Sequence, residues 1–301
     1  MLPSIIDAHV HWRDPENNPY EALSDATDED GNRSGSEARP YLPADYLADA
    51  TGFDIAGIVH IEAEWTQADP VGETRWLHAL VHDNRTGGLP VGIVGFADLS
   101  TDNVEPILEA HAEGTLTRGI RQILNRVEGQ PHLCWANREY LEDPLWQRNY
   151  ALLARHGLDF DLMCFGHQMK PFAALAARHP DIPVHLEHAG LPWDHSAAGR
   201  TIWRNGMRAL AALDHADVKI SGLGNTVPDW NENKIRDYVL ETIDIFGVER
   251  VSFASNFPTD KQFSDMPAIW NAFDRITSAF TGEERDALFA GNARRIYRIE
   301  Q

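Results

Sequence analysis

The sequence predicts a (β/α)8 barrel on three observations. Eight apolar segments of strand length recur along the chain, each followed by a longer stretch with helical spacing. The repeats together span about 250 residues, the usual size of this fold. Polar side chains gather where the apolar segments end, and the catalytic groups of such barrels project from the C-terminal ends of the strands. An open doubly wound sheet ranks second, because no GxGxxG or Walker sequence follows the first segment.

The first four predicted strands are IIDAHVHW, DIAGIVHIEA, PVGIVGFADL and TRGIRQI, which cover residues 5–12, 54–63, 90–99 and 117–123. The next four are DFDLMCF, PVHLEHA, DVKISGL and RVSFASN, which cover residues 159–165, 183–189, 217–223 and 250–256. Amphipathic helices are predicted between them, for example over residues 144–157, 169–180 and 233–247, each ending near Gly or Pro. Nothing indicates a second domain, so residues 1–301 are expected to form one barrel.

An unusual segment, residues 13–49, follows the first predicted strand. It is rich in Asp, Glu, Asn, Gly and Pro and has almost no apolar periodicity. We therefore expect a long acidic first βα loop over the barrel mouth, either a solvated excursion or a functional lid.

The charge balance restricts the partners. Lys and Arg total 26 against 46 Asp and Glu, a formal net charge of −20. A phosphate backbone or an anionic bilayer would be repelled at most approaches, so neither nucleic acid nor membrane is an expected partner. A small-molecule substrate is expected instead, and homo-oligomer formation stays open.

The two cysteines, Cys134 and Cys164, have no spacing typical of a zinc knuckle, a redox pair or a disulfide framework. The first residues also lack the basic and apolar regions of a signal peptide. We therefore expect a cytoplasmic protein.

The candidate chemistry begins with His9 and His11. Two histidines at positions i and i+2 of a strand point to the same face, which they would share with Asp7. A pair of neutral imidazoles there can bind a divalent cation such as zinc or orient a water molecule. Two buried histidines with a packing role are the alternative, and the end of a first barrel strand favours the functional interpretation.

The opening IIDAHVHW resembles the first-strand HxH motif of the amidohydrolase superfamily. GIRQIL (119–124), VHLEHAGLP (184–192), VKISGLG (218–224) and VSFASNFPTDK (251–261) resemble the fourth, sixth, seventh and eighth strands of its amidohydrolase-2 branch. That branch includes fuconolactonase-like and pyrone-dicarboxylate-hydrolase-like enzymes, which hydrolyse lactones with or without a divalent metal. The resemblance covers nearly the whole chain.

The resemblance implies roles for individual residues. His9 and His11 match the first-strand pair, His188 matches the sixth-strand histidine, and His167 lies near the fifth-strand position. Arg121 matches a fourth-strand arginine that holds an acidic substrate group or polarises a carbonyl, for which its planar fork is suited.

The last strand departs from the family pattern. Many relatives read SDWP, where the Asp is the general base, whereas this chain reads SNFP and has Asn256 there. A neutral amide cannot accept a proton from water at pH 7. Either Asp260 or a histidine such as His167 or His188 then takes that role.

The same departure weakens the case for a metal, because a carboxylate ligand is lost. Three histidines, His9, His11 and His188, can still hold one zinc ion with an open fourth position, and a metal-independent site is the alternative. A two-metal centre is not expected, since the fourth predicted strand has no lysine.

Three further residues are candidates for substrate binding. Glu62 either binds a substrate hydroxyl or supports the histidines. Trp65 and Trp193 follow the second and sixth strands, where they form aromatic pocket walls or simply pack.

The sequence thus predicts a hydrolase that cleaves a carboxylic ester in a small polar substrate, most simply a sugar-acid or dicarboxylate lactone. The alternatives are a non-catalytic or weakly catalytic ligand-binding barrel, and a zinc-dependent decarboxylase of the same branch.

Overall fold

Eight parallel strands form the centre of the computed structural model, which describes residues 2–20, 39–83, 86–227 and 229–300. They follow one another around the sheet in chain order. The strands are β1 Ile5–Val10, β2 Ile55–Ile61, β3 Gly92–Phe96, β4 Thr117–Ile123, β5 Asp159–Met163, β6 Val184–Leu186, β7 Ala216–Ile220 and β8 Val251–Phe253. Each overlaps its predicted segment.

The sheet closes where β1 meets the end of β8. Val10 pairs with Phe257 in parallel, the His11 amide donates to the Phe257 carbonyl at 2.8 Å, and the Asn256 amide donates to the His9 carbonyl at 3.0 Å. The predicted (β/α)8 barrel is confirmed, and its seam carries three of the candidate site residues.

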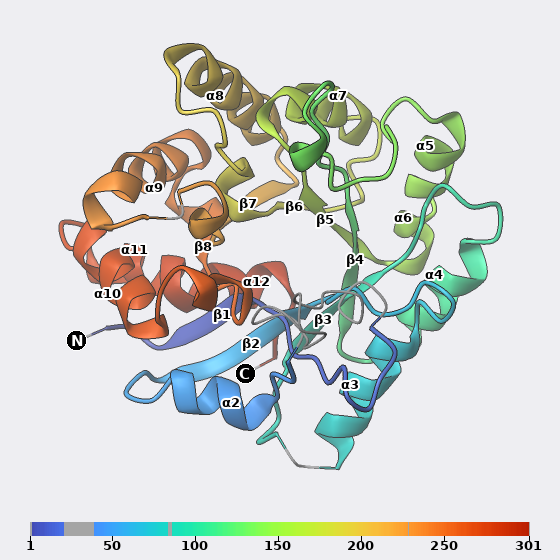
Figure 1. Cartoon of the computed structure of the whole chain (residues 1–301), viewed down its shortest axis with the longest axis horizontal. Helices are drawn as coiled ribbons and strands as arrows, with labels where there is room; N and C mark the ends of the chain where they lie inside the picture. The colour runs from blue at the N-terminus through green and yellow to red at the C-terminus, as the bar shows by residue number, and fades with distance from the viewer. Residues whose placement is uncertain (1, 21–38, 84–85, 228, 301) are drawn as a thin grey trace, which may run out of the picture.

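Helices surround this ring of strands (Figure 1). They are α2 Pro43–Asp49, α3 Gly72–His82, α4 Glu105–Ala112, α5 Pro144–Tyr150, α6 Leu153–His156, α7 Gly166–Ala176, α8 Ala197–Ala211, α9 Glu232–Phe246, α10 Met266–Ile276, α11 Gly282–Asp286 and α12 Asn292–Ile296. Shorter turns are η2 Pro131–Leu133, η3 His188–Gly190, η4 Leu223–Asn225, η5 Val248–Arg250, η6 Thr259–Gln262 and the π-helical η7 Ala287–Gly291. Side-chain caps begin several helices, such as Ser196 before α8 and Asn231 before α9.

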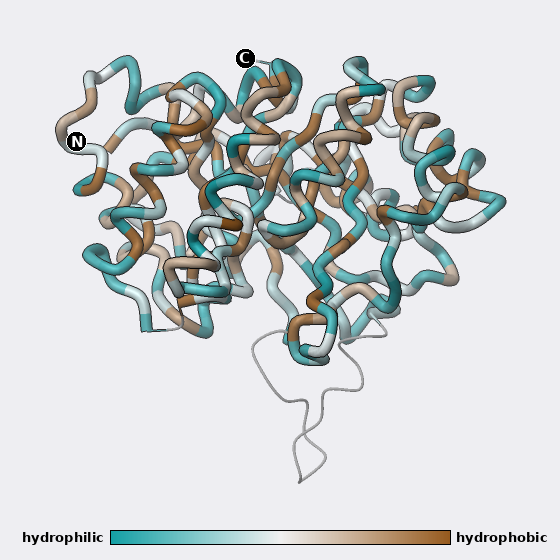
Figure 2. Tube along the Cα trace, turned by 90° about the horizontal axis from the view of Figure 1, so that it is seen from above, coloured by the Kyte–Doolittle hydropathy of each residue, from teal (hydrophilic) through white to brown (hydrophobic). Residues whose placement is uncertain are grey.

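The main core lies between the strands and these helices, as the ring contacts of Phe160 with Trp146, Tyr150 and Phe172 illustrate. Hydrophilic residues, teal in Figure 2, dominate the outer turns of the helices. None of the helices in the described ranges combines the length and the apolar character that crossing a bilayer requires.

The segment after β1 is partly described. Arg13 pairs with Tyr41 in antiparallel fashion, and the last seven residues of the predicted loop form α2. Pro43 begins this helix, and the Leu42 amide donates to the Asp45 carboxylate at 2.9 Å. The hypothesis of a lid over residues 13–49 concerns mainly residues 21–38, which lie outside the described residues.

Candidate active site

A cavity of about 220 Å³ opens at the C-terminal ends of the strands. His11 follows β1, Arg121 lies near the end of β4, His188 follows β6 and Asn256 follows β8, and all four line this cavity. Active sites of (β/α)8 barrels occupy this end of the fold.

The rings of His9 and His11 meet through their Nε2 atoms, which are 3.0 Å apart. His11 Nδ1 lies 2.8 Å from the Ile61 carbonyl oxygen. Because a carbonyl only accepts, Nδ1 of a neutral His11 carries the proton, and its Nε2 accepts. His9 therefore donates through Nε2–H, which leaves the lone pair on His9 Nδ1.

Asp7 does not join the two histidines, although regular strand alternation predicts that it shares their face. Strand β1 has an extra residue relative to β2 between Asp7 and Val10, so the alternation is broken there. The Asp7 carboxylate instead accepts from the Tyr46 hydroxyl on α2 at 2.9 Å and from the Ser255 amide at 2.8 Å.

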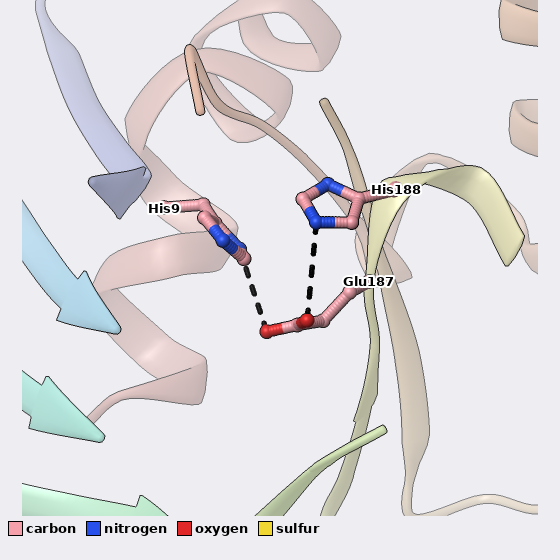
Figure 3. A group of neighbouring side chains, drawn as sticks. All are labelled: His9, Glu187 and His188. Atoms are coloured by element: carbon pink, nitrogen blue, oxygen red, sulfur yellow. Dashed lines mark ion pairs between the residues drawn. The ribbon is translucent and has the colours of Figure 1, made fainter. Parts of the chain in front are cut away.

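Glu187 is the site residue that the sequence reasoning missed. It is fully buried directly after β6, between His9 and His188 (Figure 3). The signal that could have found it is the spacing of VHLEHA, in which His185 and Glu187 stand at i and i+2 of the predicted sixth strand.

Among the described residues, His9, Glu187 and His188 form the group with metal-ligand geometry. One ligand atom each of His9, Glu187 and His188 lies within 4.8 Å of the others, whereas the predicted set of His9, His11 and His188 is not such a group. His9 Nδ1 is 3.4 Å from Glu187 Oε1 and, in the described part of the chain, has no hydrogen-bond partner. A buried lone pair facing a carboxylate fits a bound cation.

Electrostatics keep the site histidines neutral, the form that binds a metal. Burial lowers the pKa of His9 and of His11 well below the ordinary value, and it lowers that of His188 to about 4. The charge of Arg121 acts in the same direction on all three. The His188 ring is held by Ser221, whose Oγ lies 2.9 Å from His188 Nδ1.

Arg121 joins two buried carboxylates. Its Nε donates to Glu62 Oε1 at 2.7 Å, and its Nη1 donates to Glu187 Oε2 at 3.3 Å. Burial raises the pKa of Glu187, but the charges of Arg121 and Lys219 outweigh burial and lower it below its ordinary value. Glu62 thus orients Arg121 through its Nε, while Arg121 also borders the cavity.

The charge chain continues into the barrel. Lys219 on β7 donates to Glu187 Oε1 at 3.3 Å and also to Asp161 on β5. The Tyr297 hydroxyl donates to the same Asp161 oxygen at 2.8 Å. Charges therefore alternate from Glu62 through Arg121, Glu187 and Lys219 to Asp161.

Asp260 and Asn256 are adjacent, but they have different access to the cavity. Asn256 lines the cavity, whereas Asp260 is 4% exposed and is not among its lining residues. The Asn256 side-chain amide donates to Asp260 Oδ1 at 3.0 Å. Burial raises the pKa of Asp260 to about 7.

The other predicted site residues border neighbouring spaces. His167 is the second residue of α7 and has an exposed side chain, and together with Trp193 it borders a separate cavity of about 770 Å³. Trp65 and Glu62 border a third cavity, of about 310 Å³. The structure does not bring His167 to His9, His11 and His188.

Comparison with known proteins gives consistent matches. A family model described as amidohydrolase matches residues 6–299. Protein y4mH of Sinorhizobium fredii is 39% identical over 298 residues, 98% of this chain and 99% of the relative. The L-fucono-1,5-lactonase of Burkholderia multivorans is 28% identical over 314 residues, 98% of this chain and 96% of the relative.

Solved structures share the fold. The crystal structure of an amidohydrolase from Burkholderia multivorans with bound zinc superposes with a TM-score of 0.78 at 23% identity. The match covers 99% of this chain and 100% of that one.

Proposed function

Because the chain belongs to the amidohydrolase family and is a hydrolase, we propose that it opens the ring of a sugar-acid lactone by attack of water on the ester carbonyl. The observation that carries this proposal is the buried Arg121, which Glu62 and Glu187 fix at a cavity that also exposes two neutral imidazoles. The lactonase activity of the Burkholderia multivorans relative supports the same reaction class.

The guanidinium of Arg121 is proposed to bind the lactone carbonyl oxygen. Negative charge grows on that oxygen when water adds, and a fixed cation in a site shielded from solvent stabilises it. The ester bond to the ring oxygen then breaks, and the product is a hydroxy acid whose new carboxylate lies beside Arg121.

The water molecule is proposed to lie between His11, His188 and Asn256, which all line the cavity. The neutral imidazole of His188 can accept the proton of the attacking water and pass it to the leaving ring oxygen. Asp260 is proposed to hold the Asn256 amide in place, which directs the amide oxygen toward the water.

If a divalent metal is bound, His9, Glu187 and His188 would hold it. A bound zinc ion would lower the pKa of a water molecule that it coordinates. In that case His11 would support His9, because His11 Nδ1–H donates to the Ile61 carbonyl and His11 Nε2 accepts from His9 Nε2–H.

The test is hydrolysis of L-fucono-1,5-lactone and D-glucono-1,5-lactone by the purified protein, followed by acid release. Wild type should turn over at least one lactone, and Arg121→Met should lose about two orders of magnitude in kcat/KM. Arg208→Met, which removes an exposed arginine on α8, is the matched control. An Arg121→Met protein that folds and keeps wild-type kcat/KM would refute the assignment.

A further inference from the structure

Two side chains that the proposed reaction does not use border the active-site cavity from different sides. Trp135 borders it from the loop after β4, and Asn225 borders it from η4, after β7. The Trp135 backbone amide donates to the carbonyl of Asn125, two residues beyond the end of β4, at 2.9 Å. Because the strands follow one another around a closed ring, the ends of β4 and β7 lie on different sides of the cavity mouth. A ligand in the cavity therefore lies between Trp135 and Asn225.

Trp135 presents an exposed aromatic face. It is 41% exposed, and of the exposed large hydrophobic side chains in the described ranges it is the one that borders this cavity. Its indole nitrogen donates to the His132 carbonyl at 3.2 Å, and its ring lies 5.3 Å from the buried Phe165 ring between centroids. These contacts fix the indole before a ligand binds, so binding does not carry the entropic loss of ordering it. A fixed indole face suits the apolar C–H surface of a sugar-like ring.

Asn225 presents a polar group on the other side of the cavity. Its side chain is partly buried, and no hydrogen bond among the described residues uses its side-chain amide. An amide can both donate and accept, as a hydroxyl group does. Thr259 of η6, which packs against η4, adds a hydroxyl to the same wall. This wall therefore offers hydrogen bonds that match the hydroxyl groups of a ligand.

The turn that carries Asn225 is held against the proposed proton acceptor. Gly222, just before η4, has a φ of +59°, and a Cβ atom there would lie 2.4 Å from His188 Nδ1. Directly after η4, the Thr226 carbonyl oxygen lies 2.9 Å from His195 Nε2. Asn225 stands between these two contacts, so a ligand that it binds is held at a set position relative to His188.

We propose that Trp135 and Asn225 form a binding site for the substrate ring, in which Trp135 packs on the C–H face and Asn225 hydrogen bonds to ring hydroxyls. This inference rests on the proposed function, because it takes the ligand to be a lactone whose carbonyl meets Arg121. It makes Asn225 a specificity residue that selects a polyhydroxylated lactone over the same ring without hydroxyls. Neither residue takes part in breaking the ester bond.

The first experiment compares D-glucono-1,5-lactone with δ-valerolactone, which has the same ring without hydroxyls. Wild type should prefer gluconolactone in kcat/KM. Asn225→Leu, which keeps a similar volume, should reduce this preference about tenfold, mainly by raising KM for gluconolactone. Asn233→Leu, at an exposed position on α9, is the matched control and should keep the wild-type preference. An Asn225→Leu protein with the wild-type preference would overturn the inference.

Binding of D-glucono-1,5-lactam, in which a ring amide replaces the ester, tests the same site without hydrolysis. Calorimetry should give a Kd about tenfold weaker for Asn225→Leu and for Trp135→Ala than for wild type. Trp135→Phe should stay within about threefold of wild type, because it keeps an aromatic face.

The two experiments separate this inference from the proposed function. If no lactone is hydrolysed but the lactam shows these differences, the proposed function fails and the ring-binding site stands. If lactones are hydrolysed but the lactam binds wild type and either weakened variant equally, the ring-binding site is refuted and the proposed function stands. If wild type neither hydrolyses a lactone nor binds the lactam, both are refuted.

Discussion

Asn256 donates its side-chain amide to Asp260 at 3.0 Å, so a carboxylate lies beside the amide that stands where the amidohydrolase-2 resemblance implies an aspartate. The carboxylate is present one helical turn later, buried behind the amide. None of the described residues gives Asp260 a cationic partner, and burial raises its pKa to about 7.

Asp260→Asn should reduce the pH dependence of stability. The pKa of Asp260 is about 7 in the folded protein and 3.8 ordinarily, so the folded state retains a proton that the unfolded chain has already released between these values. Wild type therefore loses stability as the pH rises from about 4 to about 7. The variant lacks this loss and should be more stable by on the order of a few kcal/mol at pH 8, with no gain near pH 4.

Urea unfolding across that pH range measures the difference. Asp244→Asn, at an exposed position on α9, provides the control and should follow wild type. If Asp260→Asn follows wild type as well, Asp260 is ionised in the folded protein throughout the range.

Lys219→Met should destabilise the protein strongly. Lys219 is 1% exposed and compensates both Glu187 and Asp161. Without it, two buried carboxylates lack this cation, and breaking such a pair costs about 3–5 kcal/mol. Lys234→Met removes an exposed pair with Asp229 and should cost at most about 1 kcal/mol. Denaturant unfolding of both variants gives the comparison, and equal losses would mean that Lys219 adds nothing beyond a surface ion pair.

Zinc binding should depend on His9 and not on His167. Elemental analysis after zinc loading and desalting should give about one ion per wild-type chain and much less in His9→Asn, because His9 Nδ1 belongs to the group and has no hydrogen-bond partner in the described part of the chain. His167→Asn, at the start of α7, should retain the metal. A His9→Asn protein that binds zinc like wild type would place the metal elsewhere.

Glu62→Gln should lower activity through Arg121. The neutral amide keeps the shape of Glu62 but weakens its charge-assisted bond to Arg121 Nε. We expect kcat for a hydrolysed lactone to fall about tenfold, with a far-ultraviolet circular dichroism spectrum like that of wild type. Glu105→Gln, which alters an exposed pair with Arg155, is the control, and an unchanged kcat in Glu62→Gln would show that Arg121 needs no such support.

The fold was predictable from the sequence because its signal is repeated eight times. Each strand is an apolar run, and the chain order of a (β/α)8 barrel leaves little choice of topology. The seven-residue helix α2 was not predicted, since its segment shows composition typical of loops, and one capping aspartate is a weak signal.

Much of the site was harder to predict, because it depends on contacts between distant residues. His9 and His11 could be placed from one motif. Glu187, however, differs from many strand carboxylates only by its partners, Arg121 and Lys219, which lie on other strands. The Glu64 amide likewise donates to the carboxylate of Glu62, a contact that no local pattern predicts. A bulge in β1 also separates Asp7 from the histidines, and the sequence pattern gives no sign of it.

The contacts of Tyr297 and Arg298 have a consequence for biosynthesis. Tyr297 donates to Asp161 across 136 residues of chain, and Arg298 binds Asp159 across 139. Both aspartates leave the ribosome long before these partners have been translated. Until residues 297 and 298 emerge, Asp161 lacks its Tyr297 donor and Asp159 lacks the Arg298 guanidinium, so the native packing around β5 is completed only after nearly all of this sequence has been made.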